Sequence, residues 1–149
     1  MRAVVQRVTG CRVAVAGATI AGIESGLLVY IGVGRSDTGE DVDYLVEKIL
    51  NLRIFPDEEG RMNVSALERR SDIMVVSQFT LYGDARRGRR PSYSEAAPAA
   101  LAKALYQEFI AAIRKRVQTV ASGEFQAAMD VTYTNSGPVT ILLDSRRTF

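Results

Sequence analysis

The sequence predicts an α+β fold in one domain, residues 1–149, built from a mixed and mostly antiparallel, barrel-like β-sheet and two main helices. Short β-type runs crowd the first 33 residues and return near the end of the chain, while two amphipathic helical patterns lie between them. No internal repeat or linker divides the chain. A length of 149 residues with 47% hydrophobic content is sufficient for one domain with a genuine core.

The elements follow from local patterns. Short β-type runs at residues 4–8, 12–15, 19–23 and 27–33 are separated by glycines, which predicts a meander of four strands. Further strands are expected around residues 52–55 and 73–80, and two strands, before and after residues 135–140, close the chain.

Two helices are predicted from apolar residues spaced three or four apart. The first carries Val42, Leu45, Val46 and Ile49 and is preceded by Thr38 and Asp41 in capping-box positions. The second begins near Pro98 and carries Leu101, Leu105, Phe109 and Ile113.

The run from Ile73 to Thr80 changes halfway along from apolar to mainly polar residues. Its first four residues are apolar, as in a strand covered on both faces, and polar groups follow at its end. Buried polar side chains cost about 1 to 3 kcal/mol each unless they are hydrogen-bonded, so the fold or a ligand must satisfy them. The candidate catalytic residues are Ser77, Gln78, Phe79 and Thr80.

A glycine-broken loop after this run contains four arginines, namely Arg86, Arg87, Arg89 and Arg90. Guanidinium groups suit phosphate, so these residues are candidate RNA contacts, although a solvated loop would have the same composition. The net charge of +2 does not by itself predict nucleic-acid binding.

The chain contains no histidine, which excludes Ser-His-Asp and Cys-His catalysis and any zinc site with histidine ligands. No metal-ligand spacing or phosphate loop is present, and Gly32-Val33-Gly34 lacks the third glycine of a dinucleotide fingerprint. The single cysteine, Cys11, alternates with valines and is expected in the core. The absence of a signal or membrane-spanning pattern predicts a cytoplasmic protein without membrane contact.

Several motifs together resemble the D-aminoacyl-tRNA deacylases, in the same order and over essentially the whole chain. They include residues 2–8, 48–55, 77–82 and 88–92, and the Asn-Ser-Gly-Pro-Val-Thr segment at residues 135–140. The resemblance implies a homodimeric esterase that removes D-amino acids from mischarged tRNA at its 3′-terminal adenosine, with no metal or cofactor. It also implies that Gly137-Pro138, with a cis bond, reaches into the other subunit and rejects L-amino acids, and that Arg7 holds this dipeptide.

For the chemistry, backbone N–H groups of Phe79 and Thr80 are candidate oxyanion donors. The resemblance favours water activation by the neighbouring ribose 2′-OH, with Thr80 orienting rather than attacking, since no base for a threonine nucleophile is apparent. Ser136 and Gln126 depart from the usual Asp and Gly of the family, which puts fine substrate preference in doubt. Two alternatives stay open: a non-enzymatic module that binds tRNA acceptor ends, and an esterase acting on small molecules.

Overall fold

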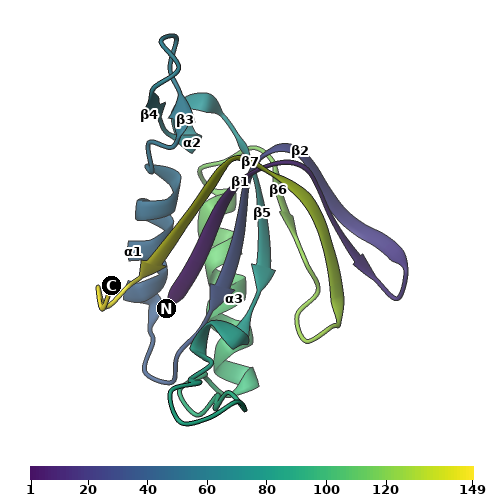
Figure 1. Ribbon diagram of the computed structural model, residues 1–149, viewed down its shortest axis with the longest axis vertical. Coiled ribbons are helices and arrows are strands. Elements are labelled where there is room, and N and C mark those ends of the chain that lie inside the picture. The colour runs from purple at the N-terminus through teal and green to yellow at the C-terminus, as the bar shows by residue number, and fades with distance from the viewer.

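The computed structural model describes residues 1–149 and has a five-stranded sheet of order β6-β5-β2-β1-β7 beside a small two-stranded sheet, β3-β4 (Figure 1). The strands are β1 (Arg2–Val15), β2 (Ala18–Gly32), β3 (Phe55–Pro56), β4 (Met62–Val64), β5 (Asp72–Ser77), β6 (Val120–Ser122) and β7 (Met129–Asp144). The helices are α1 (Gly39–Leu50), α2 (Ala66–Arg69), α3 (Ala99–Arg114) and the 3-10 helix η1 (Phe79–Tyr82). The predicted α+β class with two main helices is confirmed.

The sheet is mixed and open. Strand β1 pairs antiparallel with β2 and β7, whereas β5 pairs parallel with β2 and β6. Strands β6 and β7 are the two edges, so the barrel-like sheet predicted from the sequence is wrong. The long strands curve away from the helices at one end, as Figure 1 shows, but the sheet does not close.

The predicted meander of four short strands is also wrong, because two long strands form one hairpin in its place. The hairpin turns at Ala16 and Gly17, whose φ angles are 49° and 82°. Gly10 and Gly26 lie inside β1 and β2 at positive φ and do not end them. A glycine within a strand bends or closely packs the backbone as readily as it ends the strand.

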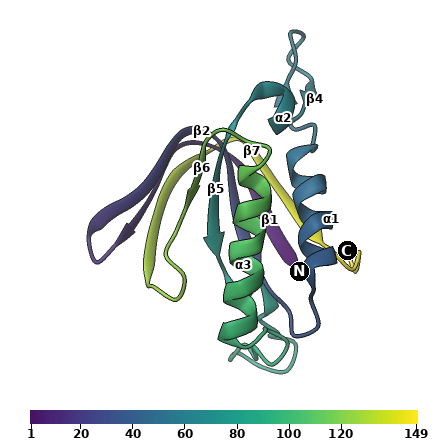
Figure 2. The same cartoon turned by 180° about the vertical axis from the view of Figure 1, so that it is seen from behind.

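Both long helices cover one face of the sheet (Figure 2). Helix α1 buries Val42, Leu45, Val46, Ile49 and Leu50, and α3 buries Leu105, Tyr106, Phe109, Ile110 and Ile113. These side chains enter a core of 23 buried residues, so the helical periodicity is confirmed. The Thr38 backbone N–H donates to Asp41 Oδ2 over 2.8 Å, as expected for a capping box.

A second cluster of seven buried residues lies on the opposite face of the sheet and includes the fully buried Cys11. The core position predicted for this thiol is confirmed, and burial raises its pKa to about 11.

Three local predictions need correction. The strand expected over residues 73–80 ends at Ser77, because its partner strand β2 has its last pair there, Ile31 with Ser77. The strand expected at residues 52–55 is reduced to Phe55–Pro56. The two strands expected at the end of the chain form one strand, β7, which is interrupted by a bulge rather than by a turn.

Candidate active site

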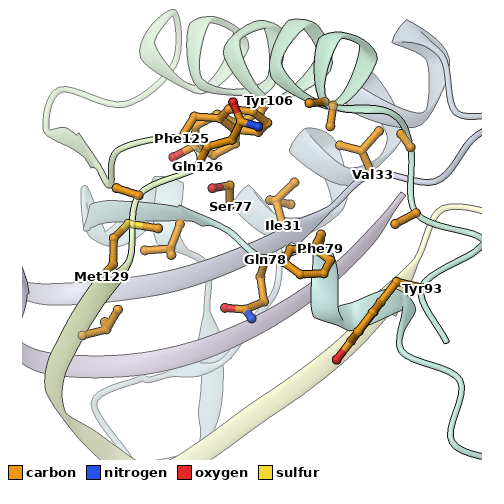
Figure 3. A pocket seen from close by; sticks show the side chains of 17 residues that line it. Ile31, Val33, Ser77, Gln78, Phe79, Tyr93, Tyr106, Phe125, Gln126 and Met129 are labelled. Atoms are coloured by element: carbon orange, nitrogen blue, oxygen red, sulfur yellow. The ribbon is translucent and has the colours of Figure 1, made fainter. Parts of the chain in front are cut away.

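A cavity of about 630 Å³ opens where β5 ends, between α3, η1 and the segment that precedes β7 (Figure 3). Its walls are mainly apolar. They include Ile31 and Val76 from the sheet, Val33 just after β2, and Tyr106 and Phe125 from the side of α3. An apolar cavity with few polar groups at its rim is the usual form of a small-ligand site.

The end of β5 brings Ser77, Gln78 and Phe79 into this cavity. The Gln78 backbone N–H still donates to Ile31 O over 2.7 Å, and the chain then turns into η1. Thr80 is exposed, does not line the cavity, and accepts a hydrogen bond from the Gln78 side-chain amide. The structure therefore brings three of the four candidate catalytic side chains together and leaves the Thr80 side chain outside.

The backbone N–H groups of Phe79 and Thr80 have no acceptor within the protein. They are the first donors of η1, and the first donors of a helix have no partner inside it. Free N–H groups at a strand end are suited to a developing negative charge.

Two side chains from other segments, Asp37 and Arg2, hold η1 in place. The Tyr82 hydroxyl donates to Asp37 Oδ2 over 3.2 Å, and Arg2 Nη1 donates to Leu81 O over 3.0 Å. The Arg2 guanidinium also lies 4.6 Å from the centroid of the Tyr82 ring. Burial and the neighbouring Asp37 carboxylate raise the pKa of Tyr82.

This support was missed in the sequence, although one signal for it was present. A Cβ atom on Gly34 would lie 2.7 Å from the Tyr82 hydroxyl, and a Cβ on Gly32 would lie 3.3 Å from its ring. The Gly32-Val33-Gly34 motif therefore leaves space for the ring of Tyr82 and has a packing explanation.

Two aromatic pairs line the cavity, and the one formed by Tyr106 and Phe125 was not identified from the sequence. The rings of Phe79 and Tyr93 meet edge to face with centroids 5.0 Å apart, and those of Tyr106 and Phe125 lie 5.8 Å apart. The Tyr106 hydroxyl donates to Val75 O over 3.0 Å, and burial raises its pKa to about 12. Such faces are suited to stacking against a planar base.

A bulge in β7 contains the second candidate region. Gln6 of β1 pairs with Thr140 and Val8 pairs with Asn135, so the four residues 136–139 stand opposite the single residue Arg7. Gly137 has a φ of 126°, and the Gly137-Pro138 bond is cis, as the resemblance implied. Val139 N–H donates to Asn135 Oδ1 over 3.1 Å and closes the bulge locally.

Arg7 joins this bulge to the rest of the protein. Its Nε donates to Ser136 O over 3.1 Å and its Nη1 donates to Ile54 O over 2.7 Å. Arg7 is half-buried, so it is not a freely exposed strand residue. Gly137 and Pro138 themselves are exposed and do not line the cavity of their own chain.

The arginine loop, residues 86–90, is closed at its base by two hydrogen bonds of 2.8 Å between the backbones of Asp84 and Ser92. Arg86 is bound to Asp84 through Nε at 2.9 Å and Nη2 at 2.7 Å, which holds the pKa of that carboxyl well below its usual range. Arg87, Arg89 and Arg90 are exposed and make no side-chain hydrogen bond. The loop therefore offers three unpaired guanidinium groups.

No group of three or more His, Cys, Asp or Glu side chains is arranged to hold a metal ion. None of the helices combines the length and the apolar character needed to cross a bilayer.

Two solved structures are similar to this chain over nearly its whole length. A structure described as "c-Myc DNA Unwinding Element Binding Protein" is 40% identical, with a TM-score of 0.92, and the match covers 97% of this chain and 98% of that one. A structure described as a probable eukaryotic D-amino acid tRNA deacylase has the same fold, with a TM-score of 0.83 at 20% identity over 95% of this chain and 97% of that one.

The family model described as D-Tyr-tRNA(Tyr) deacylase matches residues 4–144. Proteins named D-aminoacyl-tRNA deacylase from Thermosipho africanus and Thermotoga petrophila are 56% and 52% identical over 149 residues, with full coverage of both chains. One from Clostridium botulinum is 56% identical, again over the full length of both. The chain belongs to the D-Tyr-tRNA(Tyr) deacylase family, which confirms the resemblance seen in the sequence.

Proposed function

We propose that this protein hydrolyses the ester bond of D-aminoacyl-tRNA and releases the free D-amino acid and tRNA. The observation that carries this proposal is identity of 52% to 56% over the full chain with proteins named for that activity. The lack of histidine is compatible with it, because an aminoacyl ester is already activated and its hydrolysis depends chiefly on charge stabilisation and a positioned water.

The cavity is the proposed site of the terminal adenosine and its aminoacyl group. Its apolar walls and the Tyr106-Phe125 pair suit a base; Phe79, one of the two residues with a free N–H group, lines the cavity, and Thr80 follows it directly in the chain. These two groups would donate to the oxyanion that forms on the ester carbonyl. Each such donor contributes about 3 kcal/mol to a transition state of this kind.

The attacking water is proposed to be activated by the substrate rather than by a side chain. Thr80 Oγ1 is engaged by the Gln78 amide and has no carboxylate or amine within hydrogen-bond distance. A hydroxyl without a base is a weak nucleophile. The ribose 2′-OH beside the ester is then the nearest group able to assist, and Gln78, whose amide is held by Thr80 Oγ1, orients the reacting atoms.

Rejection of L-amino acids is proposed to come from Gly137 and Pro138 of a second subunit in a homodimer. Three features support this proposal: the dipeptide is exposed, its bulge is fastened by Arg7, and it does not enter the cavity of its own chain. L- and D-esters carry identical groups, so discrimination has to be steric, and a fixed backbone is suited to that.

The exposed arginines of the loop are proposed to contact tRNA phosphates, with Arg87, Arg89 and Arg90 the free members and Arg86 engaged by Asp84. Replacing Arg89 and Arg90 by Ala should raise KM and reduce the salt dependence by about 1 for each lost phosphate contact.

One experiment tests the proposed activity against the two alternatives. The protein is incubated with D-tyrosyl-tRNA, L-tyrosyl-tRNA and free D-tyrosine ethyl ester, and the release of tyrosine is followed. Rapid and selective loss of D-tyrosyl-tRNA is expected. Binding of tRNA without hydrolysis would support a non-enzymatic module, and equal hydrolysis of the free ester would support a small-molecule esterase.

A further inference from the structure

A second groove, of about 580 Å³, runs along the outer side of α3 next to the active-site cavity. The two share Tyr106 and Phe125, so this aromatic pair is the wall between them. In contrast to the cavity, the groove has polar residues as half of its ten lining residues. Its polar lining residues are Lys103, Gln107, Arg114, Ser122 and Glu124.

Three polar side chains of α3 lie on the face of the helix that lines the groove. Lys103, Gln107 and Arg114 are separated by four and seven residues, which are spacings that repeat on one side of a helix. With a rise of 1.5 Å per residue, the two cationic residues lie about 16 Å apart along the axis. That length spans more than one nucleotide of a single strand.

The two cationic side chains are unpaired. Lys103 and Arg114 are exposed, and neither forms an ion pair or donates a side-chain hydrogen bond. Arg116, two residues further on, is by contrast bound to Glu47 at 2.6 Å. Glu124 is the acidic residue that lines the groove, and it too has no ion pair.

We propose that this groove binds the phosphate backbone of the nucleotides that precede the terminal adenosine, with Lys103 and Arg114 contacting phosphates and Gln107 donating to phosphate or ribose oxygens. This inference rests on the proposed function. With the terminal base in the cavity against Tyr106 and Phe125, the preceding nucleotides can leave past the shared wall into the groove. Phosphate contacts position a nucleic acid without reading its sequence, as a site for many different tRNAs requires.

The test compares two substrates that differ in their phosphates. D-tyrosyl-tRNA contains the strand that the groove would hold, whereas D-tyrosyl-adenosine, esterified on the ribose, contains none of it. In the double variant Lys103→Ala with Arg114→Gln, KM for D-tyrosyl-tRNA should rise about tenfold or more, the effect of losing at least one hydrogen bond to a charged group. KM and kcat for D-tyrosyl-adenosine should stay at wild-type values.

Salt dependence supplies a second readout that a structural role would not change. Each contact to a single-strand phosphate contributes about 0.7 to the slope of log affinity against log salt concentration, so the double variant should lose about 1.4. The charge-conserving variant Lys103→Arg with Arg114→Lys should restore the slope. Glu124→Gln removes a negative charge that would repel the phosphates, so it should lower KM for the tRNA substrate.

Lys115→Ala is the matched control, because Lys115 is an exposed cation at the end of the same helix but does not line the groove. It should leave KM and the salt slope unchanged. An unchanged KM and slope in the double variant would overturn the inference, and so would an equal loss on both substrates. If wild-type protein fails to hydrolyse D-tyrosyl-tRNA, the proposed function itself fails, and that result does not depend on the groove.

Discussion

Arg2 and Arg7 lie five residues apart on β1, and each fastens a segment of irregular backbone that comes from a distant part of the chain. Arg2 holds η1 through Leu81 O, and Arg7 holds the β7 bulge through Ser136 O. Both segments expose backbone groups rather than reactive side chains. The mechanism proposed above uses these backbone groups in place of a histidine, so it requires both segments to be held accurately in position.

Helix η1 and the β7 bulge differ in how many contacts hold them in place. Helix η1 has a second support in the hydrogen bond from Tyr82 to Asp37, and the ring of Tyr82 is packed against Gly32 and Gly34. The bulge is closed locally by Asn135, but among side chains from other elements Arg7 is the one that fastens it. We expect the bulge to be the more sensitive of the two segments to a single substitution.

The largest effect is expected from Gly137→Ala. A Cβ atom at this position would lie 2.8 Å from both Arg7 Nη2 and Val139 Cγ2, and the φ of 126° is unfavourable for alanine. Displacing the bulge by about 1 Å should reduce kcat/KM on D-tyrosyl-tRNA about 100-fold. The measurement is single-turnover deacylation, with a sizing experiment on the same sample.

Gly17→Ala is the control for this variant, because Gly17 also has positive φ, at 82°, but its Cβ would meet no neighbour within 4 Å. Both variants should be destabilised by about 1 to 3 kcal/mol through backbone strain. Gly17→Ala should keep wild-type deacylation. Full activity of a folded Gly137→Ala protein would show that the bulge is structural and plays no part in substrate selection.

Arg7→Ala should have the next largest effect. It removes the hydrogen bonds to Ser136 O and Ile54 O, so the bulge is no longer held against the adjoining segment. We expect kcat/KM on D-substrate to fall about tenfold, as for the loss of one hydrogen bond from a charged donor, and the D/L ratio to fall with it. Arg12→Ala, at an exposed arginine of the same strand, should change neither value. An unaltered D/L ratio in Arg7→Ala would show that Arg7 plays no part in the discrimination between D- and L-substrates.

Tyr82→Phe tests the redundancy of η1. The variant loses the hydrogen bond to Asp37 but keeps the ring and the contact from Arg2 to Leu81. A net cost of about 1 kcal/mol in unfolding free energy and a fall in kcat of no more than about fivefold are expected. Urea unfolding and steady-state kinetics measure the two. A loss of activity as great as that of Gly137→Ala would show that η1 depends on the Tyr82–Asp37 hydrogen bond alone, and that it is no less sensitive than the bulge.

Thr80→Ala should have the smallest effect. The substitution removes Oγ1, which does not line the cavity, and leaves the backbone N–H groups of η1 in place. Substantial deacylation should remain, within about fivefold of wild type, a factor that corresponds to about 1 kcal/mol. Complete loss of activity, together with an acyl-Thr80 adduct detected in the wild-type protein by mass spectrometry, would show that Thr80 is a covalent nucleophile and would contradict substrate assistance.

Several features could be predicted from the sequence because they depend on residues close together in the chain. The apolar stripe of α3 and the capping box of α1 are periodic patterns within one or two turns, and both are found in the structure. The apolar run Ile73 to Val76 lies within β5, and the polar residue that follows it, Ser77, ends this strand and lines the cavity. The family could also be identified, since its short motifs recur in order along the whole chain.

Other features depended on contacts between distant residues, and local patterns do not encode them. Gly10 and Gly26 suggested turns, but the pairing of β1 resumes on both sides of Gly10, and Gly26 pairs with Val8 of β1 and Asp72 of β5, so both strands continue through them. The groove at Lys103 and Arg114 exists because residues 122–125 return beside α3. Arg2 resembles an ordinary strand arginine in the sequence, and Arg7 is singled out by the family resemblance rather than by a local pattern, because both bind carbonyl groups more than 40 residues away, at Leu81, Ser136 and Ile54. Sequence determined the elements through local periodicity, whereas tertiary structure decided which backbone groups are held in place, because that depends on hydrogen bonds between segments that meet only after folding.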